Sequence, residues 1–212
     1  MPVMTTNDAE QVEKSEKTAF WTPEMTFPAA VRTYVEARYR EADVILEYGM
    51  GGSTAFAAGL PGKTVLSVEN AKPFYDSMVA YFANVPPVAK VVLHHQDVGK
   101  TKAWGFPADA SGWPRYHDYP MAIWRHPDFV QPDLVLIDGR FRVGCFLATL
   151  FLTEMPVTVL FDDYTKRGYY HLVERYASRA ETVGRMVRFD LKPATISRAD
   201  LFTLFEELQK PG

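Results

Sequence analysis

The chain has 212 residues, of which 47% are hydrophobic, and its formal net charge is −3. This length suits one domain with a single buried core. The balanced charge, with no Lys- or Arg-rich run, argues against nucleic acid as a partner. Cys145 is the only cysteine, which excludes an intrachain disulfide and fits a reducing compartment. Because the chain has neither an apolar signal segment nor the ~20 apolar residues of a membrane span, we expect a cytoplasmic protein that does not bind membranes.

The predicted elements begin after a polar leader. Residues 1–17 carry few large apolar groups and are expected to be flexible, and the domain is expected to cover 18–212. Apolar residues at helical spacing predict a helix from Phe27 to about Arg40. Five strands are then expected over 44–46, 64–68, 91–94, 134–137 and 157–161. They alternate with helices expected over 53–58, 72–84, 143–152 and 169–179. One or two strands around 183–189 and a helix from Ser197 are expected to complete the domain.

The alternation of strands and helices favours right-handed βαβ units, and therefore an α/β fold, a three-layer αβα sandwich with a mostly parallel sheet. Ligands of such folds bind outside the carboxyl ends of the strands. Each predicted strand ends in, or shortly before, an acidic residue, and these are Glu47, Glu69, Asp97, Asp138, Asp162 and Asp163.

A glycine-rich turn follows the first predicted strand. Gly49, Gly51 and Gly52 have no Cβ, so the backbone can turn sharply and a flat or charged ligand can approach it closely. Glu69 lies 22 residues after Glu47, at the end of the next strand, where an acid can accept both ribose hydroxyls of an adenosine. The alternative is a tight turn followed by an incidental acid.

The same turn separates two classes of cofactor. A dinucleotide-binding turn would have glycine where Thr54 stands. S-adenosylmethionine (SAM) has no phosphate to place at a helix N-terminus, and it carries a sulfonium and an amino group that Glu47 can complement. The turn therefore favours SAM over NAD, and an NAD-dependent oxidoreductase stays as an alternative.

The Glu-x-Gly-x-Gly pattern from Glu47 to Gly51 resembles the first motif of class I SAM-dependent methyltransferases, and the likeness extends from about Val44 to Tyr164. Ser53 replaces a third glycine that is often present in that motif. The resemblance implies a Rossmann-like sheet of seven strands. It also implies a set of residues that contact SAM, namely Glu47, Gly49, Gly51, Gly52, Ser53, Glu69, Asn70, Gln96, Asp97 and Asp138.

Three aspartates are expected to meet at the ends of the fourth and fifth strands. Asp138, Asp162 and Asp163 would repel one another unless a cation neutralised them, and hard divalent cations prefer oxygen ligands. The segments 137–139 and 161–164 also resemble motifs of cation-dependent O-methyltransferases, including the macrocin type. That resemblance implies Mg²⁺ or another divalent cation bound by all three aspartates, beside the acceptor hydroxyl.

Other interpretations of this region need no metal. Asp138 and Asp163 can cap the helices that follow them. Basic residues close to the acids can form ion pairs with them, or can bind an acidic acceptor. These basic residues are Arg140, Arg142, Lys166 and Arg167.

Asp138 and His171 are the candidates for catalysis. His171 follows Asp163 by eight residues, and the ordinary pKa of histidine, ~6.5, suits a general base near neutral pH. A surface or packing histidine is the alternative. Cys145 lies among apolar residues and is interpreted as a buried structural thiol.

The segment 98–132 is too long for an ordinary connection. It is expected to overhang the cofactor cleft as a lid or acceptor wall, or to form a satellite cluster or a homo-oligomer contact. Its aromatic residues include Trp104, Phe106, Trp113, Tyr116, Tyr119, Trp124 and Phe129. Together these patterns predict methyl transfer from SAM to an oxygen, or failing that a nitrogen, of a small-molecule acceptor. The alternatives are a methyltransferase-like binding module without activity and the oxidoreductase.

Overall fold

A computed structural model describes residues 21–212, so the leader predicted over 1–17 lies outside the described residues. The domain is built on one seven-stranded sheet with the order β3-β2-β1-β4-β5-β7-β6. The strands are β1 (Val44–Tyr48), β2 (Thr64–Glu69), β3 (Lys90–His95), β4 (Leu134–Ile137), β5 (Val157–Phe161), β6 (Glu181–Val183) and β7 (Met186–Leu191).

The sheet is mixed, which corrects the expectation of a mostly parallel one. Strands β1 to β5 pair in parallel, as predicted. Strand β7 is antiparallel both to β5 and to β6. The reason is local, because β6 and β7 form a hairpin in which Val183 pairs with Met186 and Gly184 has a φ of +57°. Glycine adopts this left-handed conformation without a steric penalty.

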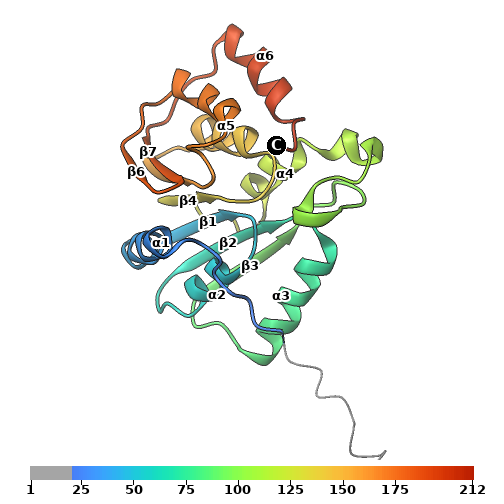
Figure 1. Ribbon diagram of the computed structural model, residues 1–212, viewed down its shortest axis with the longest axis vertical. Helices are drawn as coiled ribbons and strands as arrows, with labels where there is room; N and C mark the ends of the chain where they lie inside the picture. The colour runs from blue at the N-terminus through green and yellow to red at the C-terminus, as the bar shows by residue number, and fades with distance from the viewer. Residues whose placement is uncertain (1–20) are drawn as a thin grey trace, which may run out of the picture.

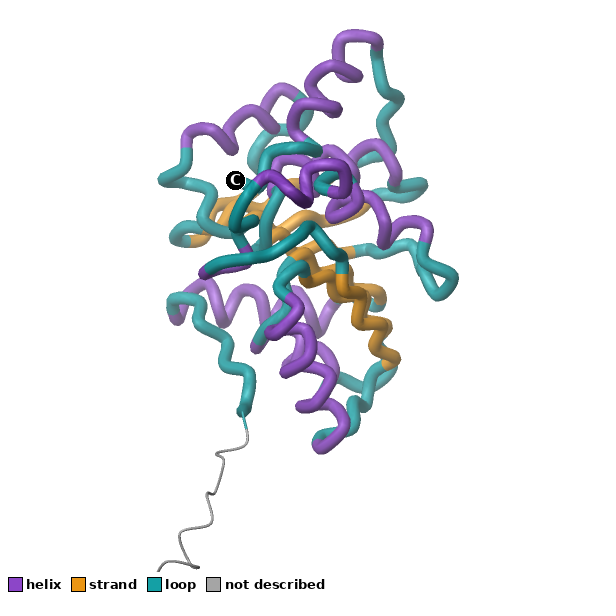
Figure 2. The backbone as a smooth tube through the Cα atoms, turned by 90° about the vertical axis from the view of Figure 1, so that its right-hand side faces the viewer, coloured by secondary structure: helices purple, strands orange, loops and turns teal. Residues whose placement is uncertain are grey.

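Helices cover both faces of the sheet, as Figures 1 and 2 show, and this confirms the three layers. Alternate side chains of one strand point to opposite faces, so Ile45 packs in one core cluster and Leu46 in the other. The first layer contains α1 (Ala29–Glu41), α2 (Gly52–Ala58) and α3 (Lys72–Asn84), and the second contains α4 (Asp118–Met121), α5 (Arg142–Leu152) and α6 (Arg198–Glu207).

The ends of three helices test the sequence prediction in detail. Ser197 caps α6 and accepts a hydrogen bond from the backbone of Asp200, so the helix begins one residue after its predicted start. The sequence also suggests Ser53 as the cap of the Ala-rich helix that follows the glycine turn. Ser53 does not cap α2, because the helix begins at Gly52 and the hydroxyl of Thr54 accepts the Gly51 N–H instead. The helix predicted over 169–179 is a shorter 3-10 helix, η4 (Gly168–Arg175).

The insertion over 98–132 divides into two parts. The second part belongs to the core, because Tyr48 donates a hydrogen bond to the carbonyl of Pro120 (2.7 Å) and accepts one from the Trp124 indole (2.8 Å). The first part presents Trp104 and Trp113 to solvent, with 86% and 57% exposure. The second part is therefore packed into the main core and does not form a separate satellite cluster. A lid or a homo-oligomer contact through the first part stays a prediction.

Among residues 21–212, none of the helices combines the length and the apolar character that a membrane crossing requires.

Candidate active site at the carboxyl edge of the sheet

The glycine turn after β1 is held against the end of β4. Gly49 has a φ of +108°, and a Cβ added to it would lie 2.7 Å from the backbone nitrogen of Gly139. A Cβ on Gly52 would overlap the backbone at Met25, whereas one on Gly51 would meet no atom within 4 Å. The turn is therefore closed by backbone at Gly49 and Gly52 and borders open space at Gly51.

Glu69 joins the glycine turn to the start of α3. Its carboxylate accepts hydrogen bonds from the backbone N–H groups of Met50 (3.3 Å), Asn70 (2.9 Å) and Ala71 (2.7 Å). Burial raises the pKa of Glu69, while these three amides lower it. A carboxylate has about four acceptor positions, so one position is left for a further donor.

Glu47 lies behind the turn. It has no exposed surface, and its Oε1 accepts a hydrogen bond of 2.7 Å from the Tyr39 hydroxyl on α1. Its Oε2 has no hydrogen-bond partner among residues 21–212. Burial raises the pKa of this acid, and the nearby hydroxyls of Thr54 and Tyr39 lower it. The structure does not bring Glu47 to the surface that Gly51 borders, so the predicted contact with a sulfonium is not formed by this arrangement.

Gln96 and Asn70, two further predicted cofactor residues, connect the end of β2 to neighbouring segments of the chain. The backbone N–H of Gln96, just after β3, donates to the carbonyl of Glu69 (2.8 Å). The Asn70 amide donates to the carbonyl of Gly105 (2.6 Å). Asn70 thereby fastens the exposed part of the insertion to the end of β2.

Asp97 and Ser53 lie at opposite extremes of exposure. Asp97 accepts from the Gly99 N–H (2.8 Å) and pairs with Arg115 at 3.2 Å, and its side chain is 59% exposed. Ser53 is 6% exposed, in the first turn of α2. Asp97 therefore stabilises a loop, in keeping with a turn residue, and Ser53 is packed within the helix.

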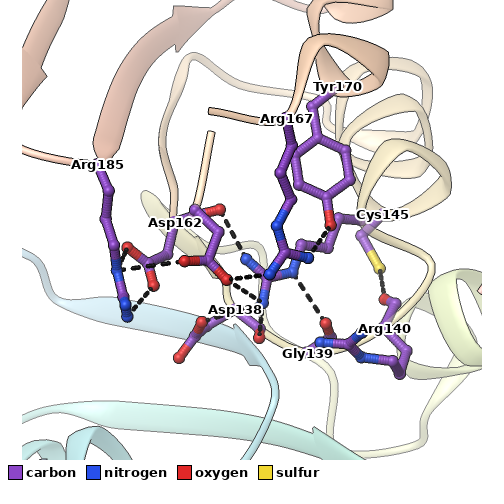
Figure 3. Close-up of polar contacts among 10 residues, drawn as sticks. Asp138, Gly139, Arg140, Cys145, Asp162, Arg167, Tyr170 and Arg185 are labelled. Carbon is purple, nitrogen blue, oxygen red and sulfur yellow. Dashed lines mark hydrogen bonds and ion pairs between the residues drawn. The ribbon is translucent and has the colours of Figure 1, made fainter. Parts of the chain in front are cut away.

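Arginines bind the aspartates at the ends of β4 and β5 (Figure 3). Asp162 is fully buried and accepts two hydrogen bonds from Arg185, from Nε (3.0 Å) and Nη2 (2.7 Å). Asp163 pairs with Arg167 at 2.8 Å and with Arg185 at 3.4 Å.

Arg142, at the start of α5, connects the end of β4 to the end of β5. Its side chain is 3% exposed. Its guanidinium donates to the backbone carbonyls of Gly139 (2.9 Å), Asp162 (2.6 Å) and Asp138 (2.6 Å). It also lies 3.3 Å from the Asp138 carboxylate and 3.5 Å from that of Asp163. One buried cation thus fixes the ends of β4 and β5 relative to each other.

Comparison with known proteins identifies the family. No family model and no curated protein sequence matches the chain. The crystal structure of a methyltransferase-like protein from Silicibacter pomeroyi DSS-3 is 44% identical, with a TM-score of 0.86 and coverage of 89% of this chain and 98% of that one. The chain belongs to the same methyltransferase-like family.

Two structures with lower sequence identity share the fold of this chain. The O-methyltransferase TomG from Streptomyces achromogenes, in complex with SAM, is 19% identical with a TM-score of 0.53, over 81% of this chain and 83% of TomG. An O-methyltransferase from Bacillus cereus, in complex with S-adenosylhomocysteine (SAH), is 16% identical with a TM-score of 0.57, over 88% of this chain and 90% of that one.

The three aspartates at the ends of β4 and β5 in this chain do not fit a metal site. Among residues 21–212 there is no group of three or more His, Cys, Asp or Glu side chains that could hold a metal ion. Guanidinium groups already occupy Asp162 and Asp163, and a divalent cation placed there would be repelled by the arginine charges. The prediction that Asp138, Asp162 and Asp163 bind Mg²⁺ is not supported, and the ion-pair interpretation describes this structure.

Asp138 differs from the other two aspartates because its carboxylate has fewer close arginine contacts. Its side chain is 33% exposed, and its closest carboxylate contact is Arg142 at 3.3 Å. Burial raises the pKa of Asp138 to about 7, since the effect of Asp162 adds to it and Arg142 only partly offsets it. Asp138 can therefore exchange a proton near neutral pH.

The structure places His171 in a packing role. Its ring stacks on Tyr164, with ring centroids 5.0 Å apart, and its Nε2 lies 3.3 Å from the Tyr164 carbonyl. Its contacts within the described chain do not include an aspartate of the edge. Catalysis by His171 stays a prediction that this arrangement does not favour over the packing alternative.

Two residues of the edge were missed in the sequence. Arg185 reaches the aspartates from the β6–β7 turn, and the glycine before it, Gly184, is the only signal of that hairpin. Tyr119 comes from the insertion, and its hydroxyl lies only 2.2 Å from the position that a Cβ on Gly139 would take. No sequence pattern predicts the contact between Tyr119 and Gly139, because it depends on how the insertion folds.

Proposed function

We propose that the protein binds SAM over the glycine turn and transfers its methyl group to an oxygen of a small-molecule acceptor. The observation that carries the proposal is the open space at Gly51, beside a carboxylate that is fixed by the turn itself. Glu69 accepts the Met50 N–H, so the ribose-binding acid and the turn are held together before any ligand arrives. Such preorganisation lowers the cost of binding.

SAM, when bound, supplies a methyl group on a positively charged sulfur. In the transfer, a bond would form between the acceptor oxygen and the methyl carbon, while the carbon–sulfur bond would break with its electron pair going to sulfur. The hydroxyl proton must leave, and Asp138 can accept it, because its pKa of about 7 matches a general base near neutral pH. An acceptor that has to lose a proton is a hydroxyl rather than a neutral amine, so this base favours oxygen.

A binding module without activity is the second candidate, and one observation favours it. The Tyr119 hydroxyl lies against Gly139, directly after Asp138, and it has no hydrogen-bond partner within residues 21–212. A side chain in this position restricts the approach of an acceptor to Asp138. Binding of SAH with no turnover of SAM across a panel of hydroxyl and amine acceptors would favour the module.

The proposal is tested by thermal denaturation with SAH and, separately, with NAD. We expect SAH to raise the melting temperature, since a ligand at 100-fold over its dissociation constant adds about 2.7 kcal/mol of stability. Glu69→Ala is expected to remove most of that rise, measured against the variant's own unliganded baseline. Glu47→Gln is the matched control, because Glu47 is a buried acid of the same edge that lies behind the turn. A rise with NAD but not SAH, or an undiminished rise in Glu69→Ala, contradicts the proposal.

A further inference from the structure

Arg140 is a buried cation without a counter-ion. It follows β4 by three residues and is 7% exposed. Its guanidinium forms no hydrogen bond or ion pair with any residue in 21–212, and its Nε is fully buried without a partner. The close-up in Figure 3 places Arg140 beside Gly139 at this edge of the sheet, and the hydrogen bond drawn to it ends on its backbone carbonyl, from Cys145. Burial lowers the pKa of this arginine, and the charge of Arg142 lowers it further.

The surroundings of Arg140 hold it in place without neutralising it. Its guanidinium lies 4.2 Å from the centroid of the Phe106 ring, and Phe106 follows the glycine whose carbonyl is bound by Asn70. A Cβ built on Gly212 would lie 3.7 Å from Arg140 Nη1, and the two residues form no ion pair. Arg140 is close enough to Glu69 to lower the pKa of that acid, yet it does not pair with it. Arg140 therefore lies between the end of β4 and the ribose-binding acid at the end of β2.

Arg142, two residues further on, is a buried arginine with a structural role, and its partners can be compared with those of Arg140. Arg142 is equally buried, but its guanidinium is bound by three backbone carbonyls and two carboxylates. A buried charge that lacks such partners is costly. The cation–π contact with Phe106 recovers only part of that cost, about 0.5–2 kcal/mol. The missing partner of Arg140 is an anion.

We propose that Arg140 is the binding site for the carboxylate of a ligand at the carboxyl edge of the sheet. The planar guanidinium can hold a carboxylate through two parallel hydrogen bonds. Two ligands can supply the group, namely the amino-acid end of SAM and an acidic acceptor. The first source rests on the proposed function, whereas binding of a carboxylate as such does not.

The test compares three probes by isothermal titration calorimetry with wild type and Arg140→Gln. SAH carries the carboxylate, 5′-deoxy-5′-methylthioadenosine is the same nucleoside thioether without it, and benzoate is a carboxylate without a nucleoside. Arg125→Gln is the matched control, because the Arg125 side chain is 72% exposed. Loss of a charge-assisted bidentate contact is expected to weaken binding about 10- to 100-fold.

If the carboxylate belongs to the cofactor, Arg140→Gln weakens SAH by this factor and leaves methylthioadenosine unchanged. If it belongs to the acceptor, SAH is unaffected and the binding of benzoate is lost. Equal affinities of wild type and Arg140→Gln for both SAH and benzoate overturn the inference. If wild type binds neither nucleoside, the proposed function fails, and benzoate still decides whether Arg140 binds carboxylates.

A second readout does not depend on any ligand. Arg140→Met removes an unneutralised buried charge while keeping most of the side-chain volume, so the unliganded variant is expected to melt at a higher temperature than wild type. Replacing an arginine with a purely structural role would lower the melting temperature. A lower melting temperature of Arg140→Met than of wild type therefore contradicts the inference that Arg140 lacks a counter-ion in the unliganded protein.

Discussion

The two halves of the carboxyl edge are held together by different forces. The turn side, which comprises 49–52 and Glu69, is held by backbone amides that donate to one carboxylate. The aspartate side, which comprises Asp138, Asp162 and Asp163, is held by arginine side chains. Acids at strand ends look alike in the sequence, but those on the aspartate side mostly have partners already, whereas the turn side keeps acceptor capacity and open space. The turn side is therefore the proposed ligand-binding side, and the aspartate side makes this edge of the sheet rigid.

The largest expected effect is the loss of Arg142. Arg142→Met leaves three backbone carbonyls without their donor and two carboxylates without one of their cations. Breaking a buried ionic group typically costs about 3–5 kcal/mol, so the free energy of unfolding is expected to fall by that amount in urea denaturation. Arg125→Met, at an exposed position, should change it by less than about 1 kcal/mol. Similar losses in both variants would show that the aspartate side does not depend on its buried cation.

A smaller effect is expected from closing the turn side. Gly49→Ala combines a φ of +108° with a Cβ only 2.7 Å from the Gly139 backbone nitrogen. Gly62→Ala is a matched control, since Gly62 has a φ of +75° and a Cβ there meets nothing within 4 Å. Backbone strain alone costs about 1–3 kcal/mol, and Gly49→Ala should exceed Gly62→Ala because the clash adds to the strain. Only Gly49→Ala should also weaken SAH in calorimetry. Equal effects on stability and binding would mean that the close approach of the turn to β4 is unimportant.

The sequence was sufficient for the parts of the fold that local patterns determine. The apolar runs at 134–137 and 157–161 gave strands with those bounds, because a buried parallel strand is a short continuous apolar segment. The acids at the strand ends followed from the same pattern. The predicted start of the last helix at Ser197 lies one residue before α6, and Ser197 caps that helix.

What the sequence could not predict depends on contacts between distant segments. Arg185 pairs with Asp162, 23 residues away, and this required the antiparallel hairpin that the α/β alternation did not suggest. Glu47 was predicted to face the cofactor because it precedes the glycines, but side-chain alternation along β1 turns it toward Tyr39. Whether an arginine such as Arg140 or Arg142 has partners is likewise invisible in the sequence, where both simply follow an acid.

The last prediction is a change in pH dependence at Asp138. Its pKa rises from 3.8 unfolded to about 7 folded, so the folded state binds this proton more tightly than the unfolded state does. Stability from this group is therefore fully present below about pH 4 and is lost as the pH rises to about 7. Asp138→Asn should remove that decline, so the free energy of unfolding of the variant should gain on wild type between pH 4 and 7. Burial also raises the pKa of Glu47 and Glu69, but both proteins share that slope, so it cancels in the difference. Parallel stability curves would mean that folding does not raise the pKa of Asp138, and Asp138 would then be too weak a base to serve as the general base near neutral pH.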